Sequence, residues 1–238
     1  MQDKKIIGIL GGMGPAATVT FFDDIVKITQ SKYGAEQDTD FSKIYLYNTA
    51  LEGFNETGFE KPDLVKKQLI NDIKKLENWG ADFIVMPCNT VHYFIDELRA
   101  SINIPIISII ESTISEVKKM QYKKVGVISS SSTRHLGLYK EKLENENIEY
   151  IIATDDEQKL LDGVILSVMT GKQGKNENEI IKNIINRMKN DNAEAIILGC
   201  TELPLAIIPS ESNLPLLNTI TILAENAIDF SREKQKDS

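Results

Sequence analysis

An internal repeat constrains the fold of this chain more than any other feature of its sequence. Three segments of the first half recur in the second half in the same order: residues 4–10, 81–88 and 102–107 resemble residues 123–129, 193–200 and 212–217. Matching positions in the two halves are separated by nearly the same number of residues in all three segments. Cys88 and Cys200, for example, lie 112 residues apart. Three ordered matches at nearly one offset indicate a duplicated unit, and the offset is far longer than the period of a solenoid.

Each half has the pattern of an α/β unit, because short apolar runs alternate with longer amphipathic segments. The sequence therefore predicts an α/β fold with two similar, pseudo-symmetric α/β domains, each a parallel sheet flanked by helices. The last strand and helix repeat the segment that links the units, and we expect them to pack back on the first one. The expected domains are residues 1–107 plus 211–238 and residues 108–210, with the active site in the cleft between them.

The boundaries of individual elements follow from apolar runs and capping residues. The expected strands are residues 6–10, 44–47, 83–87, 104–107, 125–129, 148–153, 195–198 and 216–217. Helix starts are expected at proline or at polar capping residues: Pro15, Pro62, Asp155 or Asp156, and Asn176 with Glu179 as a capping box. We expect one helix from Cys88 to about Ala100, a last helix through about Phe230, and a loop at residues 53–58.

Composition excludes several classes of protein. The net charge of −8 disfavours general binding to nucleic acids or to anionic membranes. No run approaches the ~20 apolar residues of a membrane span, and the first residues show no secretory cleavage pattern. Two cysteines in 238 residues are not a disulfide framework. We therefore expect a cytoplasmic protein whose polar tail, residues 232–238, is frayed.

The two cysteines, Cys88 and Cys200, end matching strands of the repeat and precede hydroxyl-bearing helix starts. Ligands of open α/β sheets bind beyond the carboxyl ends of the strands, and a helix N-terminus stabilises a thiolate. If the two halves face each other, two thiols meet across one cleft. Racemisation needs such a pair, because one group removes a proton from one face of a carbon and the other returns a proton to the opposite face.

The carbanion formed in such a reaction needs stabilisation by hydrogen-bond donors. Polar residues that follow the two cysteines are placed for this role, together with one backbone amide: Asn89, Thr90, Thr201 and the N–H of Val91. These groups would hold an α-carboxylate and the charge that develops on it.

Other interpretations of the same residues remain open. The cysteines can be small core residues or form a disulfide, or they can hold zinc with His92 and His135. Residues 12–17 (GMGPAA) satisfy a relaxed dinucleotide-binding pattern, which would indicate an NAD-dependent oxidoreductase. A non-catalytic ligand-binding protein would also explain a duplicated unit with a cleft.

Three motifs resemble those of the aspartate/glutamate racemase family: residues 8–15 (GILGGMGP), residues 86–90 (MPCNT) with His92, and residues 199–202 (GCTE). The resemblance covers essentially the whole chain. It implies a cofactor-independent amino-acid racemase, without pyridoxal phosphate or metal, that acts as a homodimer on a small-molecule amino acid. Cys88 and Cys200 match the two catalytic acid/base positions of the family.

The resemblance also assigns residues to the substrate. The positions that match substrate-binding segments of the family are Met13, Asn48, Thr49, Ser130 and Thr133, besides Asn89, Thr90, Val91 and Thr201. The default substrate is an acidic amino acid such as aspartate or glutamate.

One departure from the family concerns the side chain of that substrate. Aspartate-specific members carry an Arg and a Lys at places that fall here near Phe54 and Met169, and the charged residues nearby are Glu52, Glu56 and Lys172. A racemase of broader or non-acidic range, or a related isomerase such as a hydantoin racemase, is the alternative.

Overall fold

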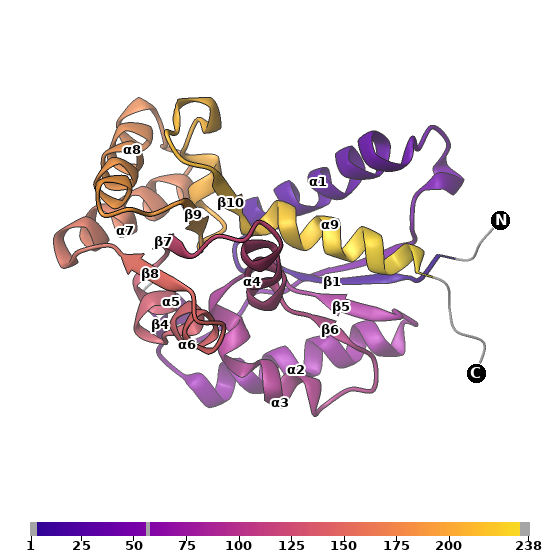
Figure 1. Cartoon of the computed structure of the whole chain (residues 1–238). Helices are drawn as coiled ribbons and strands as arrows, with labels where there is room; N and C mark the ends of the chain where they lie inside the picture. The colour runs from indigo at the N-terminus through magenta and orange to yellow at the C-terminus, as the bar shows by residue number, and fades with distance from the viewer. Residues whose placement is uncertain (1–3, 56–57, 234–238) are drawn as a thin grey trace.

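The computed structural model describes residues 4–55 and 58–233, which form two parallel four-stranded sheets covered by helices (Figure 1). The first sheet has the order β2-β1-β5-β6, and every pair of neighbours is parallel. Its strands are β1 (Ile7–Gly11), β2 (Ile44–Asn48), β5 (Phe83–Val85) and β6 (Ile106–Ile107). The helices of this part are α1 (Pro15–Tyr33), η1 (Asp38–Asp40), α2 (Pro62–Asn78), η2 (Thr90–Phe94) and α3 (Ile95–Arg99).

The second sheet, β10-β9-β7-β8, has the same connectivity as the first. Its strands are β7 (Lys124–Ile128), β8 (Glu149–Ile152), β9 (Ala195–Leu198) and β10 (Leu216–Asn218). The remaining helices are α4 (Ile109–Lys119), α5 (Ser131–His135), α6 (Leu138–Asn145), α7 (Asp155–Met169), α8 (Lys175–Asn190), η3 (Leu203–Leu205), η4 (Pro209–Glu211) and α9 (Thr219–Arg232). The predicted pseudo-symmetric α/β fold is thus confirmed.

The duplication extends to individual contacts in the two sheets. Gly8 pairs with Ile84 in the first sheet, and a Cβ at Gly8 would lie 2.8 Å from Cδ1 of Ile84. Gly126 pairs with Ile196 in the second sheet, and a Cβ there would lie 2.5 Å from Cδ1 of Ile196. Both central strands therefore carry glycine at the matching position because a matching isoleucine fills the space.

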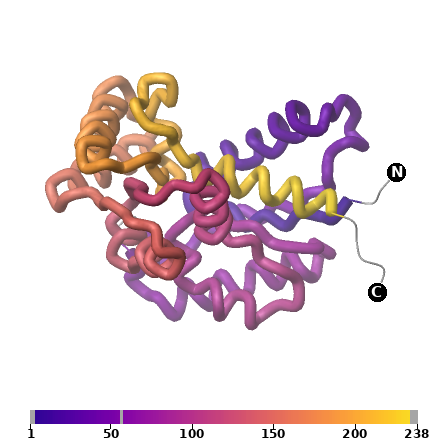
Figure 2. The backbone as a smooth tube through the Cα atoms, viewed as in Figure 1, coloured from indigo at the N-terminus to yellow at the C-terminus, as the bar shows by residue number. Residues whose placement is uncertain are grey.

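Two helices are exchanged between the sheets. Helix α9 follows β10 of the second sheet but packs against α1, beside which it runs in Figure 2. Helix α4 follows β6 of the first sheet and packs against α6 and α9. The apolar faces of α4 and α9 join one core that contacts both sheets, with members such as Ile9 and Val127. The two sheets therefore share a central hydrophobic core.

We predicted that residues 211–238 all belong to the first domain, but the structure divides this segment between the two sheets. Strand β10 is hydrogen-bonded to β9 in the second sheet, whereas α9 packs on the first unit. The local pattern of a buried strand is the same at either sheet, so the sequence does not show which sheet it joins. The division into domains stays a prediction.

Some predicted boundaries are corrected. The side chain of Thr154, and not Asp155 or Asp156, caps α7 by accepting from the N–H of Glu157. Helix α8 begins at Lys175, where Glu177 accepts from the N–H of Gly174, so the expected capping box at Asn176 does not form.

Two other segments differ from their predicted form. The loop expected at residues 53–58 carries the antiparallel pair β3 (Phe54–Asn55) and β4 (Gly58–Phe59). The helix expected up to Ala100 is divided into η2 and α3. Among the described residues, none of the helices is both long and apolar enough to cross a membrane. The frayed tail was predicted for residues 232–238, most of which lie outside the described residues.

Candidate active site

Cys88 and Cys200 lie just beyond the carboxyl ends of β5 and β9, on corresponding loops of the two sheets. Both are buried, with 5% and 7% of their surface exposed, and they are not joined in a disulfide. Each is reached from an apolar strand, and each is followed by polar residues that are themselves buried. This is the edge of a parallel sheet at which ligands bind.

Glu202 is a site residue to which we assigned no role from the sequence, although it belongs to one of the three motifs. Its Oε2 accepts hydrogen bonds from Sγ of Cys200 at 3.1 Å and from Oγ1 of Thr201 at 3.0 Å. Its Oε1 lies 3.2 Å from the place a Cβ would take at Gly14, in the loop after β1. A buried carboxylate thus joins the second thiol to the glycine-rich loop of the first sheet.

Tyr139 connects the two cysteine loops. Its hydroxyl donates to Oδ1 of Asn89 at 2.6 Å, next to Cys88, and its ring fills the space beside Gly199, where a Cβ would lie 2.9 Å from Cε2. Burial raises the pKa of Tyr139, so its hydroxyl stays a neutral donor. This connection joins residues from distant segments, and no pattern in the sequence indicates it.

Asn89 continues the same network. Its Nδ2 donates to Oγ1 of Thr219 at 3.3 Å, and the Thr219 hydroxyl donates to the carbonyl of Leu198 at 3.0 Å. Leu198 is the last residue of β9, two positions before Cys200. The side chain of Asn89 therefore holds the loops of both thiols in register.

Four buried hydroxyls form a cluster beside Cys88. Oγ1 of Thr90 lies 2.8 Å from Oγ1 of Thr133 and 3.4 Å from Oγ of Ser132. Oγ of Ser130 lies 3.0 Å from Oγ of Ser132 and 3.2 Å from Oγ1 of Thr133. The predicted residues Thr90, Ser130 and Thr133 are thus brought together from the two units. Hydroxyls can reorient to donate to an anion, so this cluster can hold a carboxylate.

His92 is a buried neutral base with a structural role. Its Nε2 accepts from the backbone N–H of Ile109 at 3.2 Å, so Nδ1 carries the proton and donates to the carbonyl of Cys88 at 2.8 Å. Burial lowers the pKa of His92 to about 4. Because both ring nitrogens are engaged, His92 fixes the Cys88 loop and has no nitrogen left for zinc. Within residues 4–55 and 58–233, no His, Cys, Asp or Glu cluster is arranged to hold a metal ion.

The other predicted site residues occupy different surroundings. Thr49 turns its hydroxyl to Oδ2 of Asp72 at 2.7 Å, and Asn48 is exposed at the end of β2. Val91 is fully buried. Met13 lines a pocket between the two units.

This pocket, which we call the interdomain pocket because residues of both predicted domains line it, has a volume of about 1270 Å³, part of it open to solvent. Its lining comes from the glycine-rich loop, the β3 region and α7: Gly12, Met13, Gly14, Pro15, Leu51, Phe54, Asn55, Asp162, Gly163, Leu166 and Met169. Phe54 and Met169, the places where a cationic anchor was expected, both line it. Among the described residues that line it, the one ionisable side chain is Asp162, which accepts from the N–H of Ser131 and from Gln158.

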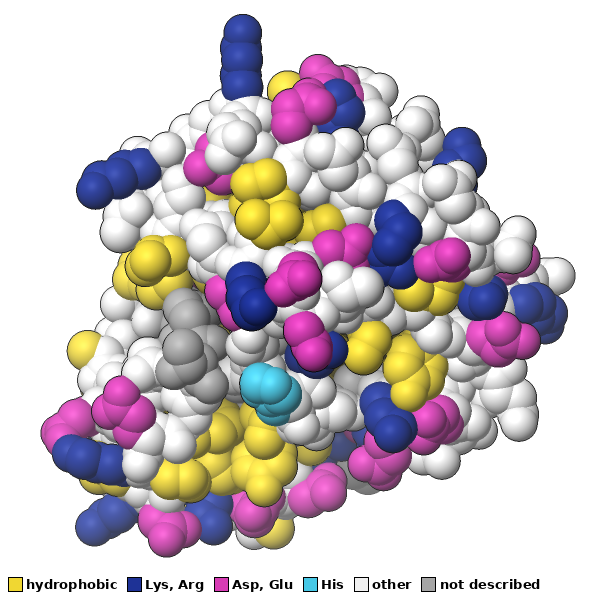
Figure 3. All heavy atoms as spheres, turned by 90° about the vertical axis from the view of Figure 1, so that its left-hand side faces the viewer, with side chains coloured by type: hydrophobic (Ala, Val, Ile, Leu, Met, Phe, Trp, Pro, Cys, Tyr) yellow, Lys and Arg dark blue, Asp and Glu magenta, His cyan; other side chains and the backbone are white. Residues whose placement is uncertain are grey.

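Of the charged residues near these places, neither Glu52 nor Lys172 lines the pocket. Glu52 is paired with Lys61 at 2.7 Å, Lys172 is not among the lining residues, and Glu56 lies outside the described residues. On the α7 side the apolar lining reaches the surface, where Leu166 is 58% and Met169 46% exposed. Figure 3 shows this side of the molecule, with hydrophobic side chains in separate groups between charged ones. The lining formed by the described residues is therefore mainly apolar, with one acidic group.

Comparison with known proteins gives consistent results. The family model described as Asp/Glu/hydantoin racemase matches residues 10–227. A broad-specificity amino-acid racemase of Bacillus subtilis is 28% identical over 223 residues, which are 94% of this chain and 96% of that protein. A glutamate racemase of Aquifex pyrophilus is 29% identical over 167 residues, or 68% of this chain and 61% of that protein.

Solved structures show the same fold. An aspartate racemase homologue from Pyrococcus horikoshii has a TM-score of 0.83 and 28% identity, covering 96% of this chain and 100% of that one. The aspartate racemase of Picrophilus torridus has a TM-score of 0.79 and 30% identity, covering 98% and 96%. The similarity thus extends over both sheets.

Proposed function

Because this chain belongs to the Asp/Glu/hydantoin racemase family, we propose that it is an amino-acid racemase that works without pyridoxal phosphate and uses Cys88 and Cys200 as its two acid/base groups. The observation that carries the proposal is that both thiols lie at corresponding strand ends, on two loops that Asn89 and Tyr139 link to each other. A two-base reaction needs this symmetric placement.

In one direction the Cys200 thiolate removes the α-proton. The C–H bond breaks, its electron pair passes into the α-carboxylate to form an enediolate, and the Cys88 thiol gives its proton to the opposite face of the carbon. In the reverse direction the two thiols exchange roles. The proton that Cys200 must lose to become a thiolate goes to Oε2 of Glu202, which already accepts its hydrogen bond. Glu202 is therefore a proton acceptor for Cys200.

The charge on the enediolate needs donors. The hydroxyls of Thr90, Thr133 and Thr201 and the backbone amides after Cys88 supply them, in a site from which water is largely excluded because these residues are buried. Preorganised donors of this kind stabilise the transition state without reorganisation, and removal of one typically slows turnover ~100-fold or more.

The lining of the interdomain pocket favours a neutral, mainly apolar substrate side chain. Leu51, Phe54, Leu166 and Met169 offer apolar surface, and a substrate carboxylate would meet Asp162 there. The acidic default substrate is therefore less favoured than the broader range. The relative from Bacillus subtilis, whose name includes broad specificity, supports the same choice.

The decisive experiment is a chiral assay of all amino acids with the purified protein and no added pyridoxal phosphate. We expect racemisation of neutral amino acids, with deuterium from the solvent at Cα, and none in Cys88→Ala or Cys200→Ala. Full racemisation by Cys200→Ala would overturn the two-thiol mechanism. Activity on hydantoins alone would favour the related isomerase. If the parent and both cysteine variants bind a ligand and none of them turns it over, the protein is a binding protein.

The resemblance to the family also supports two further parts of the proposal, a cytoplasmic location and a homodimer. Light scattering coupled to size-exclusion chromatography tests the second. A mass near 26.7 kDa, that of one chain, would contradict it.

A further inference from the structure

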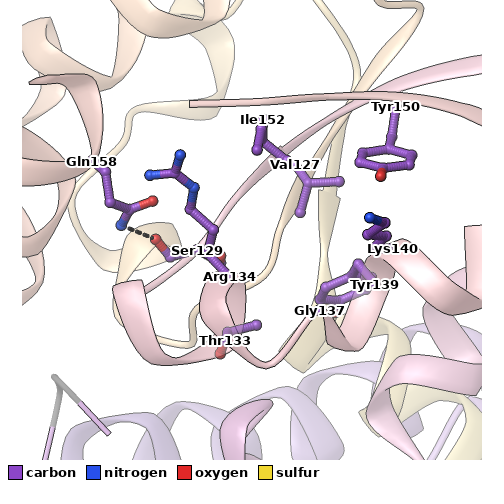
Figure 4. Close-up of a pocket in the computed structure, with 10 residues that line it drawn as sticks. All are labelled: Val127, Ser129, Thr133, Arg134, Gly137, Tyr139, Lys140, Tyr150, Ile152 and Gln158. Atoms are coloured by element: carbon purple, nitrogen blue, oxygen red, sulfur yellow. Dashed lines mark hydrogen bonds between the residues drawn. The ribbon is translucent and has the colours of Figure 1, made fainter. Parts of the chain in front are cut away.

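A second pocket lies at the outer edge of the second sheet, between β8 and the segment of α5 and α6 (Figure 4). It has an empty volume of about 580 Å³, part of it open to solvent. Its lining residues are Val127, Ser129, Thr133, Arg134, Gly137, Tyr139, Lys140, Tyr150, Ile152 and Gln158. We call it the edge pocket, and the reaction proposed above leaves it without a role.

Two cations border the edge pocket. Lys140 is exposed and, within the described part of the chain, makes no hydrogen bond or ion pair. Arg134 is bound through Nη2 to Asp155 at 2.8 Å, but the Asp155 side chain is 88% exposed, so the pair is weak. The guanidinium keeps its other donors for a ligand. Figure 4 shows the two head groups at opposite ends of the pocket, Arg134 beside Gln158 and Lys140 beside Tyr150, so an anionic group of a ligand can bind beside Lys140.

A buried amide faces the same cavity. Gln158 is only 5% exposed, and its Nε2 donates to the carbonyl of Ser129 at 2.9 Å and to Oδ1 of Asp162 at 3.0 Å. These two bonds fix the orientation of the amide, and in Figure 4 its oxygen points toward Arg134. No protein donor in the described residues reaches this oxygen, so it is an acceptor held ready for a donor on a ligand.

The rest of the lining is apolar. Val127 is nearly buried, and Ile152 is 42% exposed because β8 is the edge strand of its sheet. The rings of Tyr139 and Tyr150 complete the wall (Figure 4). Apolar surface next to a few polar groups is typical of small-molecule sites. The pocket thus fits a small carboxylic acid with an apolar body and one hydrogen-bond donor.

The edge pocket shares two residues with the candidate active site. Tyr139 lines it and donates to Asn89, and Thr133 lines it and contacts Thr90. A ligand that packs on Tyr139 and Thr133 binds the conformation in which Tyr139 contacts Asn89 and Thr133 contacts Thr90. A ligand that prefers one arrangement shifts the population toward it.

We propose that the edge pocket is an effector site for a small carboxylic acid with an apolar body, which promotes turnover by holding Tyr139 and Thr133 in place. The regulatory part of this proposal rests on the proposed racemase activity, whereas the binding part does not. Coupling between two sites commonly changes affinity or rate by about fivefold or more, and a rise of that size in kcat/KM is expected on saturation.

The probe for the test is 3-hydroxybenzoate, which carries a carboxylate, an aromatic body and a hydroxyl donor. Its binding is measured by calorimetry in the whole protein, in Ile152→Trp, which fills the pocket from the edge strand, and in Lys140→Ala. Lys142→Ala, on the same helix but outside the lining, is the matched control. We expect the Kd to rise about tenfold or more in the first two variants and to stay unchanged in the control.

The outcomes separate the two proposals. A variant with both Cys88→Ser and Cys200→Ser should bind the probe as the parent does. This binding is expected even if the parent shows no racemisation. The absence of racemisation would contradict only the proposed function. Equal binding by Ile152→Trp, no binding by the parent, or purely competitive inhibition of turnover would each overturn the effector site.

Discussion

Replacement of Glu202 by glutamine tests the link between the buried carboxylate and the second thiol. Glu202→Gln keeps the size of the side chain and an oxygen acceptor, but removes the charge that receives the proton of Cys200. A hydrogen bond to a charged group contributes about 1.5–3 kcal/mol, and each 1.36 kcal/mol corresponds to a tenfold change in rate. We therefore expect kcat/KM to fall by about 10- to 150-fold.

The two directions of the reaction should differ in their isotope effects and not in the size of this loss. The two enantiomers have equal free energy in water, so kcat/KM must fall equally in both directions. The difference appears in the isotope effect of substrate deuterated at Cα, because only one direction uses Cys200 to remove the proton. That effect should increase in the direction in which Cys200 removes the proton. It should fall towards unity in the other direction, because there Cys88 removes the label and the slowed Cys200 step becomes rate-limiting.

The assay follows ellipticity from each enantiomer of the best substrate, with protonated and deuterated forms in parallel. Glu179→Gln, an exposed acid on α8 that is paired with Lys182, serves as the control. If kcat/KM of Glu202→Gln stays within about threefold of the parent, or the isotope effects change equally in both directions, the carboxylate does not serve Cys200 as inferred.

Three further results are expected. Gly126→Ala places a Cβ 2.5 Å from Cδ1 of Ile196 and should destabilise the protein by about 1–3 kcal/mol in urea denaturation; if Ile196→Val in the same chain restores nothing, the contact is not the cause. The pKa of His92 is about 4 when folded against 6.5 as the ordinary value, so the unfolded state binds the proton first and stability falls by about 3 kcal/mol as the pH drops from 6.5 to 4. Denaturation at several pH values should show a flatter slope for His92→Asn, and an equal slope would contradict this. Met169→Lys puts a cation in the interdomain pocket and should raise the ratio of aspartate to leucine racemisation about tenfold in a chiral assay, unless the substrate side chain lies elsewhere.

The duplicated sheets and the two thiols could be predicted because their signals are local. Buried parallel strands are nearly continuous apolar runs, and the repeat shows which runs correspond. Both cysteines end such runs, so their position at the carboxyl edge follows from the strand pattern.

The features that the sequence did not show depend on tertiary contacts, or on a choice between neighbouring residues that suit the same role equally well. Thr154 caps α7 although Asp155 and Asp156 are equally suitable residue types. The bond between Tyr139 and Asn89 joins residues 50 positions apart, and nothing in either segment indicates the partner. Strand β10 has the apolar pattern of any buried strand, so its sheet is decided only by packing.

The exchange of α4 and α9 bears on how such a chain could have arisen. A single ancestral unit that ended after the helix corresponding to α4 would leave the apolar face of that helix, with residues such as Ile110 and Ile114, without its partner. Two copies would cover these faces by trading helices, as the halves do now. The halves of the present chain differ in that the second carries Glu202 after its cysteine and has α7 before α8, whereas the first carries the glycine-rich loop. Expression of the two halves as separate chains should therefore give one reconstituted complex and not two independent proteins.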